Sequence, residues 1–234
     1  MSAAAQAWLA GPRKGRAAAP LPDLSRVSLN LITAEQLSLA EAAAACARAG
    51  VPWIGPWRHK LTDGAESAAR VVREAGLRVS SLCRGGFFPA ADGAGRRERD
   101  GDNRRAVDEA AALGTEVLVL VCGPAPGGDL RAARRMVLEG IERLVPHAAE
   151  RGVRLGIEAL HPMMIGERSV VVTLAQALDL AERFEAGQVG VVVDAYHVWW
   201  DPELERQLER AAGRVFAYHV SDWLVPTTDL LAGR

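Results

Sequence analysis

Short apolar runs alternate with longer amphipathic segments along the chain from Arg26 onward. Runs such as Val117–Val121 (VLVLV) and Val191–Val193 (VVV) are rich in β-branched residues and show no polar alternation. This pattern is typical of parallel strands that are covered on both faces. Seven strands are predicted, at Val27–Ile32, Val51–Pro56, Arg78–Cys83, Glu116–Cys122, Arg154–Leu160, Val189–Asp194 and Arg214–Val220.

The segments between these strands are rich in Ala, Leu and Arg, with apolar residues at helical spacing. Several of them are followed by a glycine, such as Gly50, Gly114 and Gly152, as expected where a helix ends in a left-handed residue. Helices are predicted at Leu39–Ala49, Gly64–Ala75, Arg104–Leu113, Leu130–Glu150, Leu174–Phe184 and Glu203–Ala212.

This order of elements predicts an α/β protein with the architecture of a (β/α)8 TIM barrel, of which about seven βα units are present. An open doubly wound sheet is the alternative, but no G-x-G-x-x-G follows the first predicted strand. Polar residues also follow many strands instead of gathering at one switch point. The eighth strand is expected to be missing from the chain, and a further unit would need roughly 30 residues. We therefore expect a C-terminally incomplete barrel domain at 26–234, after a disordered lead-in at 1–25.

Composition narrows the function classes. The net charge is −1 with basic and acidic residues interspersed, so nucleic acid is not an expected partner. No run of apolar residues is long enough for a membrane span. The three cysteines, Cys46, Cys83 and Cys122, form no C-x-x-C pair, and a cytoplasmic location is expected. A homo-oligomer is compatible with this composition.

Three consecutive predicted strands end in a residue that can bind a metal ion. Glu158 lies near the end of one predicted strand, Asp194 ends the next, and His219 follows the apolar residues of the third. A carboxylate at the end of an apolar strand is costly to desolvate and is normally paired, hydrogen-bonded or metal-bound. Two carboxylates and an imidazole suit Mn²⁺ or Mg²⁺, and Co²⁺ or Zn²⁺ remain compatible. A structural polar network is the competing interpretation.

Other polar and aromatic residues at strand ends are candidates for binding substrate. Arg84 precedes Gly85 and Gly86, and such glycines allow the backbone to approach an anion that the guanidinium binds. Each candidate also has a structural interpretation, such as a salt bridge for Arg84 or core packing for the tryptophans. The predicted substrate-binding residues are His197, His161, Arg84, His59 and Trp57, and Trp53, Trp199, Trp200 and Trp223 are further candidates for the wall of a pocket.

At these residues the sequence resembles the xylose isomerase-like TIM barrels, which include sugar-phosphate isomerases and epimerases. Glu158, Asp194 and His219 match the first three metal ligands of the epimerase members in order and spacing, and Asp194-Ala195-Tyr196-His197 matches their Asp-x-x-His pattern. The resemblance implies proton transfer through an enediolate, with Glu158 catalytic, on a small sugar, sugar phosphate or related hydroxy-carbonyl compound. It also implies a second glutamate beyond Arg234, so that this chain as given is expected to have little activity.

Three other functions are weighed against this one. A dehydratase of the inositol-degradation type uses a similar barrel. An endonuclease of the same superfamily would need a trinuclear zinc site and a basic surface, whereas this chain has five histidines and no net positive charge. A non-catalytic barrel that acts as a binding subunit is the remaining alternative, because a barrel fold alone does not determine chemistry.

Overall fold

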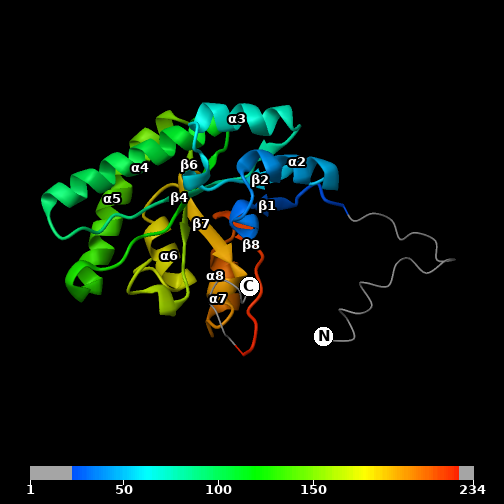
Figure 1. Cartoon of the computed structure of the whole chain (residues 1–234). Helices are drawn as coiled ribbons and strands as arrows, with labels where there is room; N and C mark the ends of the chain where they lie inside the picture. The colour runs from blue at the N-terminus through cyan, green and yellow to red at the C-terminus, as the bar shows by residue number, and fades with distance from the viewer. Residues whose placement is uncertain (1–22, 227–234) are drawn as a thin grey trace.

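The computed structural model describes residues 23–226 (Figure 1). Most of the expected lead-in at 1–25 lies outside these described residues. The described part consists of short parallel strands with helices packed around their outer side. This is the expected βα architecture.

The strands form two parallel sheets that follow the order of the chain. A bridge between Trp57 and Cys83 connects the two sheets. In the described part of the chain, β1 pairs only with β2 and β8 only with β7, so the barrel is not closed. One sheet contains β1 (Ser28–Asn30), β2 (Trp53–Gly55) and β3 (Arg78–Val79), and the other contains β4 (Leu82–Gly85), β5 (Val117–Leu120), β6 (Arg154–Glu158), β7 (Val189–Asp194) and β8 (Val215–His219).

The predicted third strand, Arg78–Cys83, is divided into β3 and β4. The chain pairs with β2 up to Val79 and then with β5 from Leu82. At the change of partner the Ser80 hydroxyl lies 2.7 Å from the hydroxyl of Ser28. This one segment therefore contributes a strand to each sheet. Its hydrophobic pattern did not predict the change of pairing partner.

Two predicted helices have the observed bounds, and the others differ at their ends. The largest difference is α4, which begins at Gly93 and not at Arg104 because Asp92 caps it by accepting from the Gly95 amide at 2.8 Å. Its first turns carry mostly polar, solvent-facing residues, so they lack the apolar periodicity that marks a helix. The helices are α2 (Leu39–Ala49), α3 (Ala65–Glu74), α4 (Gly93–Leu113), α5 (Leu130–Glu150), α6 (Leu174–Ala181), α7 (Ala195–Val198) and α8 (Leu204–Arg210), with α7 unpredicted.

The core lies between the strands and the apolar faces of the helices. Leu118, Leu155 and Val191 on the central strands are fully buried in the main cluster. Inside the ring of strands, Cys83, Val119 and Val192 form a second, smaller cluster. No helix in 23–226 is both long enough and apolar enough to cross a membrane.

Candidate metal centre

The predicted ligands lie at the carboxyl ends of three neighbouring strands. Glu158 is the last residue of β6, Asp194 the last of β7 and His219 the last of β8. Asp194 and His219 are register partners across β7 and β8. Parallel pairing thus places the two residues side by side, at the end of a barrel where active sites are built.

The three side chains converge on one point. The His219 Nδ1 lies 2.9 Å from Glu158 Oε1 and 3.8 Å from Asp194 Oδ2. One ligand atom of each residue lies within 4.8 Å of the other two. Glu158 and Asp194 are only 6% and 7% exposed, so these charged groups are largely withdrawn from water.

The electrostatics of the cluster centre on the imidazole. Burial disfavours the charged form of His219, but the hydrogen bond and charge of Glu158, with the charge of Asp194, outweigh it and raise the pKa of His219. Asp194 also accepts a 2.8 Å hydrogen bond from the Tyr196 amide, which fixes its carboxylate at the start of α7. Asp194 is therefore held in place from outside the cluster, whereas Glu158 is held by its hydrogen bond with the imidazole of His219.

This donor set fits a divalent metal ion. Two carboxylates and one imidazole nitrogen meet at the end of the barrel, where both carboxylates are largely buried. Oxygen-rich ligand sets with one imidazole suit Mn²⁺, Mg²⁺, Co²⁺ or Zn²⁺. Glu158, Asp194 and His219 are the residues that would hold it.

Two predicted substrate-binding histidines lie next to the cluster. His197 is buried in α7, and its Nδ1 accepts a 3.2 Å hydrogen bond from the His161 amide. The His161 ring stacks on Trp223 with a centroid distance of 4.8 Å, and burial lowers the pKa of this histidine. Trp223 also contacts the rings of Tyr196 and Trp199. An aromatic wall of Tyr196, His161, Trp199 and Trp223 thus stands beside the candidate metal centre.

Trp57 and His59 follow β2 but have different surroundings. Trp57 packs against the inner cluster beneath the carboxylates, and its Nε1 donates to Asn30 at 2.8 Å. The His59 side chain is half exposed, and its Nε2 lies 2.9 Å from a carboxylate oxygen of Glu35. The structure therefore places Trp57 at the interior of the barrel and His59 at an exposed ion pair. Trp53 is likewise engaged elsewhere, with Arg78 stacked on its ring.

Arg84 lies near the end of β4. The glycines that follow it were expected to let an anion approach the backbone, but Gly86 has a different role in the structure. The Gly86 amide donates to Asn103 Oδ1 at 2.6 Å, so this amide is not available to an anion. A Cβ at Gly86 would lie 2.7 Å from backbone atoms of Val121. The glycine is needed because the chain packs closely here, and only the Arg84 side chain remains a candidate for anion binding.

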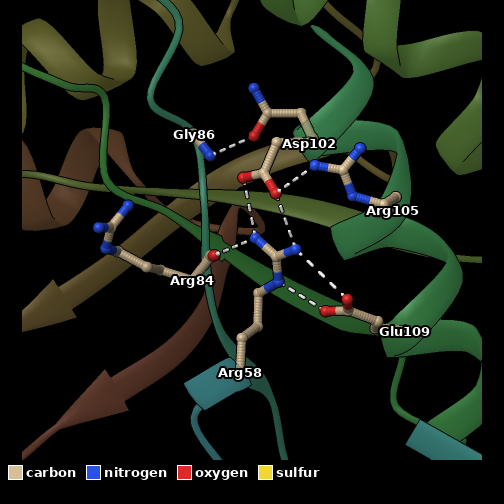
Figure 2. Close-up of polar contacts among 7 residues, drawn as sticks. Arg58, Arg84, Gly86, Asp102, Arg105 and Glu109 are labelled. Atoms are coloured by element: carbon tan, nitrogen blue, oxygen red, sulfur yellow. Dashed lines mark hydrogen bonds and ion pairs between the residues drawn. The ribbon is translucent and has the colours of Figure 1, made fainter. Parts of the chain in front are cut away.

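Arg58, one of the polar residues that follow β2, organises a polar network between the β2 loop and α4 (Figure 2). Its guanidinium donates to both carboxylate oxygens of Asp102, each at 3.0 Å, and its Nε to Glu109 at 2.5 Å. A further bond at 3.4 Å reaches the carbonyl oxygen of Arg84. Arg58 therefore ties α4 to the end of β4, and nothing in its local sequence identified partners so distant in the chain.

Comparison with known proteins gives one curated relative. The chain is 32% identical over 168 residues to a 3-dehydroshikimate dehydratase of Pseudomonas aeruginosa. The match includes 68% of this chain and 25% of the relative. The chain thus spans about a quarter of the length of that protein.

Solved structures share the fold. Protein SMc04130 from Sinorhizobium meliloti 1021 is 51% identical, with a TM-score of 0.86 over 90% of this chain and 78% of that one. The IolI protein with a bound zinc atom is 20% identical, with a TM-score of 0.71 over 84% of this chain and 72% of that one. A D-psicose 3-epimerase in the presence of D-fructose is 15% identical, with a TM-score of 0.72 over 86% and 75%. The last two show the fold alone.

The model of one protein family matches most of the described barrel. It is the Xylose isomerase-like TIM barrel family, and the match extends over residues 43–233, which include all three residues of the candidate metal centre. The chain belongs to the Xylose isomerase-like TIM barrel family.

Proposed function

We propose that the protein is a divalent-metal-dependent isomerase or epimerase of a small sugar, sugar phosphate or related hydroxy-carbonyl compound. One observation carries this proposal: Glu158, Asp194 and His219 converge at the ends of β6, β7 and β8. A bound divalent ion would polarise the carbonyl and hydroxyl oxygens of such a substrate and make the neighbouring C–H bond more acidic.

The side chains around this point suit proton transfer. Glu158 is a buried carboxylate and serves as the base that removes a proton from the carbon beside the carbonyl. The electron pair of that C–H bond forms the enediolate. Return of the proton from Glu158 to the adjacent carbon gives an isomer. Formation of an epimer needs a second acid that delivers a proton to the opposite face of the same carbon, the role that the family resemblance assigns to a second glutamate.

Neighbouring residues position the substrate in this proposal. His197 lies one helical turn after Asp194, and its Nδ1 accepts from the His161 amide, which orients the ring. In this proposal His197 contacts a substrate oxygen. The apolar faces of Trp223 and Trp199 suit the C–H face of a sugar.

A dehydratase acting on a keto-sugar or related compound is the second candidate. The 32% identity with a 3-dehydroshikimate dehydratase favours it. Both reactions begin with removal of a proton beside a carbonyl, and they differ in the next step. A dehydratase expels a hydroxide from the next carbon, whereas an isomerase or epimerase returns the proton.

The experiment is proton exchange in deuterated water, followed by NMR on a panel of ketoses, their phosphates and hydroxy-carbonyl acids with Mn²⁺ added. An isomerase or epimerase incorporates deuterium beside the carbonyl and forms the isomer, whereas a dehydratase forms an unsaturated product. Glu158→Gln should abolish exchange, and Glu167→Gln, at an exposed loop position, should leave it unchanged. Exchange on one face of the carbon needs Glu158 alone, so it is expected even where formation of an epimer is slow for lack of a second acid. A protein that binds Mn²⁺ yet exchanges no proton on any compound would contradict the proposal and favour a non-catalytic barrel.

A further inference from the structure

Arg84 presents its guanidinium without a carboxylate partner in the described part of the chain. The guanidinium carbon lies 3.8 Å from the centroid of the Phe87 ring, so one face of the group rests on that ring. Figure 2 shows the Arg84 side chain directed away from the Arg58 network, to which it contributes only its backbone carbonyl oxygen. Stacking leaves the N–H edges of the guanidinium free to donate.

The acidic residues of the Arg58 network are already engaged. Asp102 bonds Arg58 through both oxygens and also accepts from Arg105 at 3.1 Å. Glu109 accepts from Arg58 through both of its oxygens. Within this network the carboxylates therefore hydrogen-bond other arginines, and neither of them forms an ion pair with Arg84.

A second arginine, Arg168, lies in the loop after β6. Its backbone is fixed, because its amide donates to the carbonyl of Met164 at 2.8 Å and its carbonyl accepts from the Gly123 amide at 2.9 Å. The Nε atom is buried and has no hydrogen-bond partner among residues 23–226. A buried donor without a partner carries a desolvation cost that a bound acceptor would remove.

Both arginines lie beside Phe87 at the metal-centre end of the barrel. The Arg84 guanidinium stacks on the Phe87 ring, and the Arg168 carbonyl accepts from the amide of Gly123, where a Cβ would lie 3.3 Å from the Phe87 Cα. Burial, followed by the positive charge of Arg168, lowers the pKa of Arg84. The charges of both arginines and of Glu158 also act on the buried Cys83 thiol, which lies in the inner cluster below the carboxylates. Two partly buried like charges repel each other, and a bound anion would relieve that repulsion.

We propose that Arg84 and Arg168 together bind an oxyanion of the substrate, a carboxylate or a phosphate group, beside the candidate metal centre. This inference rests on the proposed function and narrows its substrate class to hydroxy-carbonyl compounds that carry such a group, in place of neutral sugars. Guanidinium groups bind carboxylate and phosphate oxygens through paired N–H donors, and two of them compensate a full negative charge or more.

The test is calorimetric titration of the metal-free protein with inorganic phosphate and, separately, with glycolate. Saturable binding of at least one probe is expected, and the probe that binds more tightly identifies the anion as phosphate or carboxylate. Arg84→Met and Arg168→Met should each weaken binding at least about tenfold, since each removes charge-assisted hydrogen bonds. Arg206→Met is the matched control, because it removes an exposed arginine of α8, and it should bind as the unaltered protein does.

Two further measurements keep the outcomes distinct. Arg84→Lys retains the charge but loses the planar fork, so binding should lie between that of the unaltered protein and that of Arg84→Met. The thermal midpoint of Arg84→Met should not fall, because the substitution removes the repulsion between Arg84 and Arg168.

Three outcomes would overturn the oxyanion site: no saturable binding of either probe, unchanged binding by both Met variants, or unfolding of Arg84→Met. Bound Mn²⁺ with no bound anion would reject this inference alone, whereas anion binding without metal binding would reject the proposed function alone.

Discussion

The imidazole Nδ1 of His219 lies 2.9 Å from Oε1 of Glu158, although a whole strand, β7, separates the strands that carry them. The contact forms because the strand ends of a barrel converge on its axis, so side chains from alternate strands meet above the inner layer. Asp194, at the end of the intervening strand, lies 3.8 Å from the same nitrogen. Curvature of the sheet, and not proximity in the chain, builds the candidate metal centre.

Removal of a ligand should abolish metal binding. His219→Ala or Asp194→Ala should lower Mn²⁺ affinity by more than the roughly 10- to 100-fold that loss of an outer-sphere partner typically costs. Elemental analysis after dialysis against Mn²⁺ and gel filtration measures the bound metal. His147→Ala is the control, because that imidazole is also largely buried and paired with a carboxylate, Asp108, but on α5. Equal metal content in all four proteins would show that the ligand assignment is wrong.

The pairing of β7 with β8 should depend on Gly190. A Cβ at this position would overlap the carbonyl oxygen of Arg214 and lie 2.7 Å from the Phe216 ring. Gly190→Ala should therefore lower the free energy of unfolding by about 3 kcal/mol, as overpacking does when backbone must shift. Because β8 carries His219, metal affinity should fall as well.

The control for Gly190 lies just before the same strand. A Cβ at Gly187 would have nothing within 4 Å, so Gly187→Ala should change stability by less than about 1 kcal/mol. Urea unfolding measures both variants, with Mn²⁺ titration for the site. Similar stability of the two variants would contradict the close approach of β7 and β8.

The Arg58 network should stabilise the fold in a pH-dependent way. The Arg58 side chain is 21% exposed, whereas Asp102 and Glu109 are 38% and 31% exposed, so screening by water reduces the effect. Arg58→Met should lower the free energy of unfolding near neutral pH by about 2 kcal/mol. The exposed partner provides the control: Arg105→Met should cost under about 1 kcal/mol.

The sign of the pH dependence follows from Asp102. The hydrogen bond from Arg58 lowers the pKa of Asp102 in the folded protein. The stabilisation that ionised Asp102 contributes is therefore complete above its pKa in the unfolded chain, about 3.9. It is lost as pH falls through the lower pKa that Asp102 has in the folded protein. The difference in unfolding free energy between the unaltered protein and Arg58→Met should shrink on acidification. A difference that stays constant from neutral to strongly acidic pH would contradict this ion pair.

The sequence predicts the positions of the candidate metal ligands better than it predicts their surroundings. Glu158, Asp194 and His219 each end or follow an apolar strand, so strand pattern alone places them at one end of the barrel. Arg168 lies in an irregular loop, where no periodicity indicates the direction of a side chain. Arg58 finds Asp102 and Glu109 at separations of 44 and 51 residues, and only the packing of α4 brings them together.

Some features of the fold could also be predicted from the sequence, and others could not. The apolar face and capping glycine of α2 identified its bounds, and Ser38 with Glu41 completes a capping box. The start of α4 at Gly93 could not be predicted in this way, because its first turns face solvent and bury no apolar stripe. The division between β3 and β4 also depends on which neighbour each residue pairs with, a property of the folded sheet and not of the local sequence.

The three cysteines should be unreactive in the native protein. Burial raises the pKa of the Cys46 thiol and raises that of Cys122 to about 12, with a smaller contribution from Glu158 at Cys122. Burial and then the charge of Glu158 raise the pKa of Cys83 well above its ordinary value. A raised pKa keeps a thiol protonated, and the thiolate is the reactive form.

Labelling with an aromatic disulfide reagent tests this prediction at about pH 8, close to the ordinary cysteine pKa. None of the three cysteines should react in the native protein, and all three should react once urea unfolds the chain. Rapid labelling of one thiol in the native protein would show that the inner cluster around Cys83, or the packing around Cys46 or Cys122, is open to solvent, and mass spectrometry of the labelled peptide would identify which.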